Sequence, residues 1–335
     1  MSTTLRQATI INLIQQNSTI DSNTFFAEDV KTGLSKKQKT LSSRYFYDGQ
    51  GSRLFQQIME LPEYYLTRCE YEIFSENKAL ISQQFAQNEF FHLIDLGAGD
   101  ALKSKILIKE LAQQKSTFEY IPVDISGDAM QTLVESFRTE MPAVPVQAVV
   151  GEYFEALAWL HENKPGRKVI MFLGSNIGNF TLTEGISFLQ KVRQYLQPGD
   201  SLFLGVDLRK DPQTILRAYD DAVGTTAEFN LNLLHRINRE LGGNFQVEQF
   251  KHYAVYNPLK GAMQSFLISQ KDQDVTIGAI GEIFHFSAWE AIHTENSHKY
   301  SLNGVARMAD QSNFKVETVY LDEKSYFADI LLKAN

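Results

Sequence analysis

A turn with closely spaced glycines follows the first apolar run of the stretch "LIDLGAGDALKSK". A dinucleotide fingerprint needs a third glycine for close packing of the helix on the strand, but Gly97 and Gly99 are followed by Ala101 and Leu102. Asp95 stands shortly before Gly97, where a carboxylate would repel phosphates and attract a cationic amino-acid group. The turn therefore favours a nucleoside that carries such a group over a dinucleotide.

The next two apolar runs end in residues that suit the rest of this nucleoside. Asp124 ends the second run, where an acidic residue can accept hydrogen bonds from both ribose hydroxyls, and Glu152 and Tyr153 follow the third run, where adenine usually lies. Together these strand ends indicate S-adenosylmethionine (SAM) as the cofactor and a methyltransferase as the protein class. Two interpretations stay open: a strand–helix turn without a ligand, and a nicotinamide-dependent oxidoreductase.

Short apolar runs and helical patterns alternate through the middle of the chain. Near-continuous apolar runs are typical of parallel strands that are covered on both faces, and the segments between them have apolar residues at helical spacing. The strands are expected at 91–97, 119–126, 144–153, 167–175 and 200–208, and the helices at 104–114, 127–140, 153–163 and 182–197. This alternation predicts a doubly wound, Rossmann-like α/β sheet.

The pattern changes on both sides of this region. From about Arg209 a helical stretch is followed by alternating apolar and polar residues, which predict an antiparallel α+β insertion up to about residue 300. The tail after 300 predicts a helix and two strands that finish the parallel sheet. Near the N-terminus, "TIINLIQQ" reads as an amphipathic helix, and a pair of helices is expected to break at Leu61-Pro62. We expect the insertion to pack with this N-terminal region.

Composition excludes several classes of partner. The 335 residues carry a formal net charge of −8, and lysines and arginines are scattered among acids, so we expect no nucleic-acid partner. Cys69 is the single cysteine, and neither a signal peptide nor a stretch long enough to span a membrane is evident. These features predict a cytoplasmic protein with a small-molecule substrate and no membrane partner, and they are compatible with a monomer.

From about Ser42 to the C-terminus the sequence resembles the histidine-specific SAM-dependent methyltransferases that trimethylate the α-amino group of L-histidine in ergothioneine biosynthesis. The resemblance is carried by "RYFYDGQGSRLFQQIMELPEYYLTRCEYEIF", "FLGSNIGNF", the long block that starts at "PGDSLFLGVDLRKDPQT", and "HTENSHKY". It implies a SAM-binding methyltransferase domain at 69–207 plus 300–335, and a substrate-binding domain at 10–68 plus 208–299. The implied activity is N-methylation of histidine, up to trimethylation that gives hercynine.

The resemblance also assigns individual residues. For the cofactor it adds Lys103 and Gly174 to Gly97, Asp124 and the pair Glu152-Tyr153, where the family usually has Asp-Phe. For the substrate it implies that Asn179 and Tyr47 meet the amine as the catalytic pair, that Tyr64 and Tyr219 hold the carboxylate, and that Glu295 and Ser297 meet the imidazole. A carboxylate accepts from an imidazole N–H, and a hydroxyl can pair with the other ring nitrogen.

Ser265 departs from the family, which often has a methionine in the ring pocket near this position. The smaller, polar side chain leaves a betaine-forming methyltransferase of tyrosine or tryptophan as an alternative, although Glu295 favours histidine. A second alternative is a catalytically silent SAM-fold binding module. Asn179 could also merely cap a helix that begins near Thr181. No metal is expected, because His285, His293 and His298 lack the companions of a zinc site.

Overall fold

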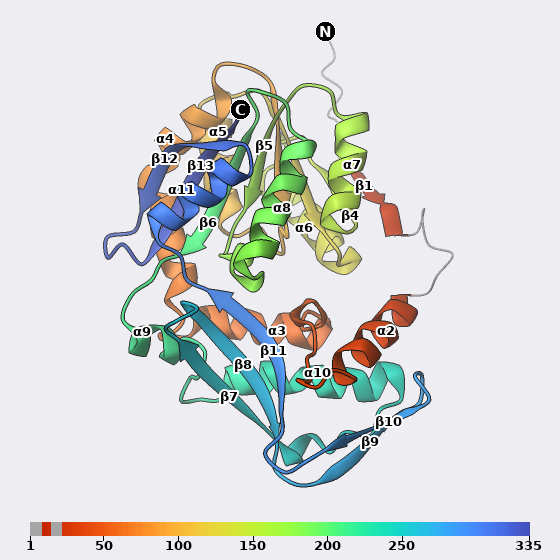
Figure 1. Cartoon of the computed structure of the whole chain (residues 1–335). Coiled ribbons are helices and arrows are strands. Elements are labelled where there is room, and N and C mark those ends of the chain that lie inside the picture. The colour runs from red at the N-terminus through yellow and green to blue at the C-terminus, as the bar shows by residue number, and fades with distance from the viewer. Residues whose placement is uncertain (1–8, 15–21) are drawn as a thin grey trace. The chain divides into compact units, whose positions relative to one another are not determined.

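The computed structural model describes residues 9–14 and 22–335, which form two compact units (Figure 1). Of the described residues, the first unit comprises 9–14, Arg68–Leu208 and Tyr300–Asn335, and the second comprises 22–67 and Arg209–Lys299. The second unit is therefore built from a segment near the N-terminus and a long insertion into the first. No helix among the described residues combines the length and the apolar character needed to cross a membrane.

The first unit is built on an eight-stranded sheet with the order β1-β4-β3-β2-β5-β6-β13-β12. Strands β2 to β6 are parallel where they pair, and this confirms the predicted doubly wound α/β class. The strands of this sheet are β1 (Thr9–Asn12), β2 (Phe91–Leu96), β3 (Phe118–Asp124), β4 (Gln147–Val150), β5 (Arg167–Phe172), β6 (Ser201–Asp207), β12 (Phe314–Leu321) and β13 (Phe327–Ala334).

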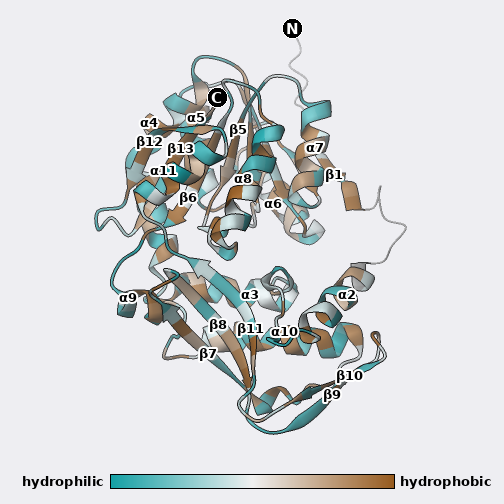
Figure 2. Cartoon of the chain, in the orientation of Figure 1, coloured by the Kyte–Doolittle hydropathy of each residue, from teal (hydrophilic) through white to brown (hydrophobic). Residues whose placement is uncertain are grey.

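Helices cover both faces of this sheet, which is why its central strands are mostly apolar and appear mostly brown in Figure 2. In β6, Leu202 and Leu204 belong to the core cluster that also holds side chains of α7, α8 and α11. The alternate residue Phe203 faces α4, where it contacts the rings of Phe74 and Phe85. The helices of this unit are α4 (Tyr65–Ala86), α5 (Ser104–Gln113), α6 (Gly127–Glu140), α7 (Tyr153–Asn163), α8 (Leu182–Gln194) and α11 (Leu302–Gln311).

One prediction about the ends of this sheet was wrong. The segment "TIINLIQQ" begins with a strand rather than a helix, because β1 pairs in parallel with β4, Ile10 opposite Ala148 and Ile11 opposite Val149. It therefore belongs to the first unit, not to the expected 10–68 segment of the substrate domain. The β-branched isoleucines suit a strand. The backbone groups at the edge of β4 supply hydrogen-bonding partners for it, and the spacing of apolar residues in the sequence does not show that these partners are present.

The tail completes the sheet with a helix and two strands, as predicted. Strand β13 runs antiparallel to both β12 and β6, because only a short turn joins β12 to β13 and such a turn cannot connect parallel strands. In that turn Asp322 accepts hydrogen bonds from the backbone N–H groups of Tyr326 and Phe327, at 2.7 and 2.6 Å.

The second unit combines helices with two antiparallel sheets of orders β11-β8-β7 and β10-β9. Its long helix α10 packs against β7 and β8. As predicted, the chain breaks at Leu61-Pro62, since α3 ends at Glu60 and α4 starts at Tyr65. The elements are α2 (Ser22–Leu34), η1 (Ser43–Tyr45), α3 (Gly49–Glu60), α9 (Pro212–Arg217), α10 (Thr225–Leu241), η3 (Val247–Gln249), β7 (Phe250–Asn257), β8 (Ala262–Ser269), β9 (Gln273–Ile277), β10 (Glu282–Phe286) and β11 (Ala291–His298).

Candidate active site

The glycine turn after β2 has a backbone that requires glycine. Gly97 and Gly99 have φ angles of +75° and +53°, in the left-handed region where a side chain adds strain. A Cβ on Gly97 would also lie 2.8 Å from the hydroxyl oxygen of Tyr153. The turn is anchored to the neighbouring strand by the N–H of Gly97, which donates to the carbonyl of Val123 at 2.8 Å. The structure thus brings two predicted cofactor residues, Gly97 and Tyr153, side by side.

Asp124 ties the end of β3 to the same turn. Its carboxylate accepts hydrogen bonds from the N–H of Gly99 at 3.2 Å and from the N–H of Ser126 at 3.0 Å. Burial raises the pKa of this carboxyl group, although the backbone donors work in the other direction. A carboxylate has lone pairs beyond those used by two donors, so Asp124 retains acceptor capacity for a diol. Glu152, which comes before α7, is its N-cap residue.

Asp95 has a different environment from the one expected. The side chain is buried, and its Oδ2 accepts from the hydroxyls of Ser104 at 2.6 Å and Tyr120 at 2.9 Å. Burial raises the pKa of Asp95 to about 6, against the opposing effect of these hydroxyls. The carboxylate therefore joins the end of β2, the start of α5 and strand β3. Its contact with a cationic ligand stays a prediction.

A buried ion pair that the sequence did not indicate supports the other cofactor positions. Glu70 of α4 is fully buried, and its Oε1 accepts from the N–H of Gly174 at 2.7 Å while its Oε2 pairs with the ammonium of Lys103. Burial opposes the charge on Lys103, but the adjacent Glu70 outweighs it and raises the pKa of the lysine. Gly174 has a φ of +69°. Glu70 therefore fixes two residues that the family resemblance assigns to the cofactor.

Asn179 ends a short 3-10 helix, η2 (Asn176–Asn179), that follows β5. The alternative that Asn179 caps the next helix is wrong, because Thr181 is the N-cap of α8 and forms a capping box with Glu184. Tyr300 stabilises this segment, because its hydroxyl donates a hydrogen bond to the carbonyl of Ile177 at 3.0 Å. The part of Asn179 in holding an amine stays a prediction.

The predicted substrate tyrosines form a connected series of rings within the second unit. The Tyr47 ring lies 5.4 Å from that of Phe55, which lies 6.1 Å from that of Tyr64, and Tyr64 lies 6.4 Å from Tyr219. Asp48 positions the first member, since it caps α3 by accepting from the N–H of Gly51 at 2.7 Å and also accepts from the amide of Asn232 at 2.8 Å. Phe55 was not among the predicted site residues. Its only indication in the sequence is its place on the apolar face of α3.

Tyr219 connects these aromatic rings to strand β11. Its hydroxyl lies 2.8 Å from the hydroxyl of Ser297, and the ammonium of Lys299 donates to both oxygens at 2.8 Å. All of these side chains are buried. The structure thus joins the residue assigned to the substrate carboxylate with one assigned to the imidazole, and it adds the buried cation Lys299 to both.

Glu295 lies directly opposite Ser265 in the pairing of β11 with β8, and Ser297 lies opposite Met263. Glu295 and Ser297 therefore share one face, as alternation predicts, and Met263 adds a methionine to that face. A bulge between His293 and Glu295 sets this register. Within the described part of the chain no donor is bonded to the Glu295 carboxylate. Burial raises the pKa of Glu295 to about 7, although Lys299 acts to lower it.

The bulge residue Thr294 connects strand β11 to helix α10 and strand β8 through hydrogen bonds. Its hydroxyl donates to the side-chain oxygen of Asn230 at 2.9 Å and to the carbonyl of Ser265 at 3.1 Å, and Asn230 belongs to the buried side of α10. On the other face of β11, His293 pairs with Asn296 at 3.2 Å. The histidines near Glu295 thus have local partners, as does His285, which lies 2.9 Å from Asp274.

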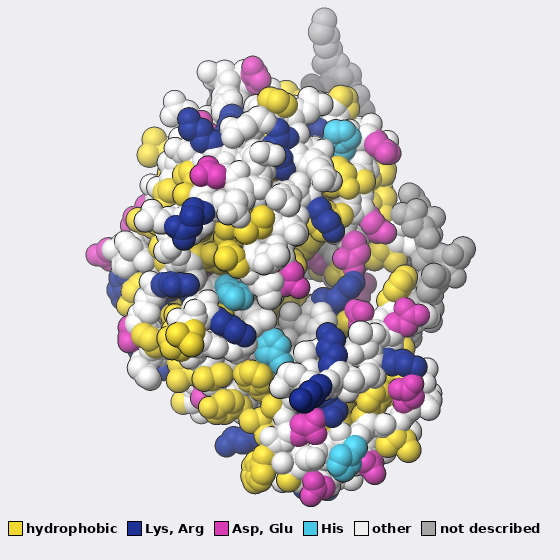
Figure 3. All heavy atoms as spheres, viewed as in Figure 1, with side chains coloured by type: hydrophobic (Ala, Val, Ile, Leu, Met, Phe, Trp, Pro, Cys, Tyr) yellow, Lys and Arg dark blue, Asp and Glu magenta, His cyan; other side chains and the backbone are white. Residues whose placement is uncertain are grey.

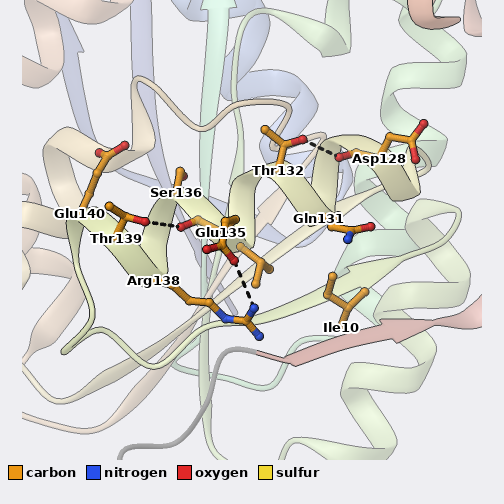
Figure 4. A pocket seen from close by; sticks show the side chains of 10 residues that line it. Ile10, Asp128, Gln131, Thr132, Glu135, Ser136, Arg138, Thr139 and Glu140 are labelled. Atoms are coloured by element: carbon orange, nitrogen blue, oxygen red, sulfur yellow. Dashed lines mark hydrogen bonds and ion pairs between the residues drawn. The ribbon is translucent and has the colours of Figure 1, made fainter.

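A shallow depression along α6 contains none of the predicted site residues (Figure 4). It is lined by Ile10 of β1 and by solvated side chains of the helix, including the pair Arg138–Glu135 at 3.2 Å. On the face drawn in Figure 3, basic side chains are interspersed with acidic ones and form no continuous stripe. Neither surface competes with the predicted residues as a candidate active site.

The chain is similar to known methyltransferases over most of its length. The profile of a family described as "Histidine-specific methyltransferase, SAM-dependent" matches residues 26–334. The histidine N-alpha-methyltransferase of Mycobacterium tuberculosis is 38% identical over 272 residues, 81% of this chain and 83% of the relative. That of Mycolicibacterium smegmatis is 37% identical over 283 residues, 84% and 87% of the two chains. A 4-dimethylallyltryptophan N-methyltransferase of Aspergillus fumigatus is 26% identical over 286 residues, 82% and 83% of the two chains. The chain belongs to the histidine-specific, SAM-dependent methyltransferase family.

Proposed function

We propose that this enzyme transfers methyl groups from SAM to the α-amino group of L-histidine, up to the trimethylated betaine hercynine. The observation that supports histidine as the substrate is the Glu295 carboxylate, which has no bonded donor among the described residues and shares a strand face with the Ser297 hydroxyl. An imidazole N–H would supply the missing donor, and the hydroxyl could pair with the other ring nitrogen.

The residues of the first unit suit SAM. Gly97 and Gly99 allow close approach of a ligand to the backbone, Asp124 can accept from ribose hydroxyls, and Tyr153 offers a ring at the adenine position. We assign the amino-acid part of SAM to Lys103 and Gly174, the two residues that Glu70 holds in place. When bound, SAM supplies a sulfonium methyl group that an amine can attack.

The enzyme's own residues act mainly by positioning. We assign the amine to Tyr47 and Asn179 and the carboxylate to Tyr64 and Tyr219. Each transfer needs a neutral amine with a lone pair, and the mono- and dimethylated amines must lose a proton before the next transfer. Solvent can take this proton, since a tyrosine hydroxyl with an ordinary pKa of about 10 is a poor base at neutral pH. The tyrosine rings can stabilise the growing ammonium charge.

The second candidate function is methylation of tyrosine or tryptophan, which Ser265 favours because it is smaller than the methionine usual in the family. Histidine remains preferred because a bulky ring without a suitably placed donor would leave Glu295 unpaired, at a cost of about 1–3 kcal/mol. Met263 on the same strand face can fill part of the space that Ser265 leaves.

A competition experiment tests the proposal. The wild-type protein and the Ser265→Met variant are incubated with SAM and a pool of free L-amino acids, and the products are identified by mass. We expect histidine carrying one to three added methyl groups from both proteins. Preferential methylation of tyrosine or tryptophan by the wild type would refute histidine as the substrate, and no methylated amino acid at all would favour the silent binding module.

A further inference from the structure

A second buried acid lies beside the ion pair of Glu70 and Lys103. Asp329 belongs to strand β13 and is fully buried. It is paired with Gly205 of β6 on one side and with Tyr320 of β12 on the other. Within the described residues, neither carboxyl oxygen of Asp329 accepts a hydrogen bond from any donor. Such an acid is unusual, because an ionised carboxylate that leaves water without gaining a donor strongly destabilises the fold.

Gly205 provides the space in which the two acids approach each other. A Cβ on this residue would overlap Oε1 of Glu70, and it would lie 3.1 Å from Oδ1 of Asp329. The carboxyl group of Glu70 lies within hydrogen-bonding reach of Asp329. Two ionised carboxylates can only accept hydrogen bonds, so a bond between these two groups requires a proton on one of them.

The contacts of the two acids indicate which of them holds this proton. Glu70 accepts from the N–H of Gly174 at 2.7 Å and is paired with the ammonium of Lys103, and both contacts favour its ionised form. Burial and then the charge of Glu70 raise the pKa of Asp329 well above its usual range, although Lys103 acts to lower it. The proton therefore belongs to Asp329, and its O–H can donate to Glu70.

This proton sets the charge of the region around Lys103. With Asp329 neutral, the single negative charge of Glu70 balances the single positive charge of the lysine. An ionised Asp329 would leave a surplus of negative charge, to which Asp95 would add, because that acid also interacts with Lys103. Such a surplus would repel the carboxylate of SAM.

We infer that Asp329 is a positioning residue for SAM, which keeps its proton and donates it to Glu70 in a hydrogen bond. Glu70 in turn holds Lys103 and Gly174. The inference rests on the proposed assignment of these two residues to the amino-acid part of SAM. A neutral carboxylic acid suits this place, because it supplies a donor beside Glu70 without adding a second negative charge.

Two variants at position 329 separate the role of the donor from that of a charge. Asp329→Asn keeps the size and a donor but cannot ionise, whereas Asp329→Ala has no donor. We expect SAM affinity, measured by titration calorimetry, to stay within about threefold of the wild type in the Asn variant and to fall about 10-fold in the Ala variant. A 10-fold loss in the Asn variant would overturn the inference, because Asp329 would then act as a negative charge.

Infrared spectroscopy tests the proton itself, without any ligand. A protonated carboxyl group has a C=O stretch at a higher frequency than the bands of an ionised carboxylate. We expect this C=O band of a protonated acid in the difference spectrum of the wild type minus Asp329→Asn at neutral pH. Carboxylate bands in its place would refute the inference. This measurement decides the question even if the Ala variant fails to fold.

A Lys103→Met variant distinguishes this inference from the assignment on which it rests. If Lys103→Met weakens SAM binding and a folded Asp329→Ala does not, the assignment of Lys103 to SAM stands and the role of Asp329 is refuted. If neither variant weakens SAM binding, the assignment of Lys103 is wrong and the role of Asp329 is overturned with it. Losses in both variants, with affinity retained in Asp329→Asn, would support the inference.

Discussion

Replacing Glu295 by glutamine should make the protein more stable at alkaline pH. Burial raises the pKa of this carboxyl from 4.5 to about 7 in the folded chain, so the ionised form is less favourable in the folded state than in the unfolded state. The penalty is absent below pH 4.5, grows between 4.5 and about 7, and is fully present above that. At about 1.36 kcal/mol per pKa unit, the shift from 4.5 to about 7 corresponds to at most about 3.4 kcal/mol, which the neutral glutamine would regain.

Urea unfolding followed by circular dichroism at pH 5 and pH 8 measures this effect. We expect Glu295→Gln and the wild type to have similar midpoints at pH 5, and the variant to be the more stable at pH 8. Glu290→Gln is the matched control of opposite sign. Although burial alone would raise the pKa of Glu290, its ion pair with Lys39 at 2.5 Å and other contacts lower it, so this variant should lose stability above the pKa.

A Glu295→Gln variant that is no more stable than the wild type at pH 8 would refute the reasoning. It would mean that the carboxylate is solvated or already has a partner in the folded protein. A donor from the substrate would then not be needed to satisfy it. The stability measurement therefore tests, without any ligand, whether the Glu295 carboxylate is buried and unpaired, and histidine recognition depends on the same property.

Three further predictions concern ligand binding and turnover. Glu295→Ala should weaken histidine binding about 10- to 100-fold and leave SAM binding nearly unchanged; if calorimetry shows both affinities falling together, the imidazole assignment is wrong. Asn179→Ala should reduce kcat more than SAM affinity, and full activity in that variant would remove Asn179 from the site. Gly97→Ala should weaken SAM binding, because its φ of +75° and the hydroxyl of Tyr153 at 2.8 Å leave no room for a methyl group; unchanged SAM affinity by titration would contradict this.

The alternating strands and helices of the first unit could be predicted because the spacing of apolar residues differs between strands and helices. Runs such as Phe91–Leu96 and Ser201–Asp207 are buried on both faces and are mostly apolar. The edges could not be predicted in this way. Whether Thr9–Asn12 forms a strand, and in which direction β13 runs, depends on the partner strand and on the length of a turn.

The cofactor turn was predictable from the chain for a related reason. Gly97 and Gly99 are visible in the sequence, and the positive φ angles that they adopt are a local requirement. The substrate residues Tyr64, Tyr219 and Glu295 had no comparable local signal, and only the family resemblance singled them out. The aromatic contacts through Phe55 arise from tertiary packing of α3.

Glu70 and Lys299 show why some functional residues stay invisible in a sequence. Each is a charged residue in a polar context, which composition assigns to the solvent, yet each is almost fully buried. A buried charge is tolerated only when partners compensate it, and here those partners lie far along the chain: Lys103 and Gly174 for Glu70, and Tyr219 for Lys299. In both units the compensating groups are residues proposed to touch a ligand. Burial of such a charge therefore points to a role in fixing ligand-binding groups, and only the folded chain reveals it.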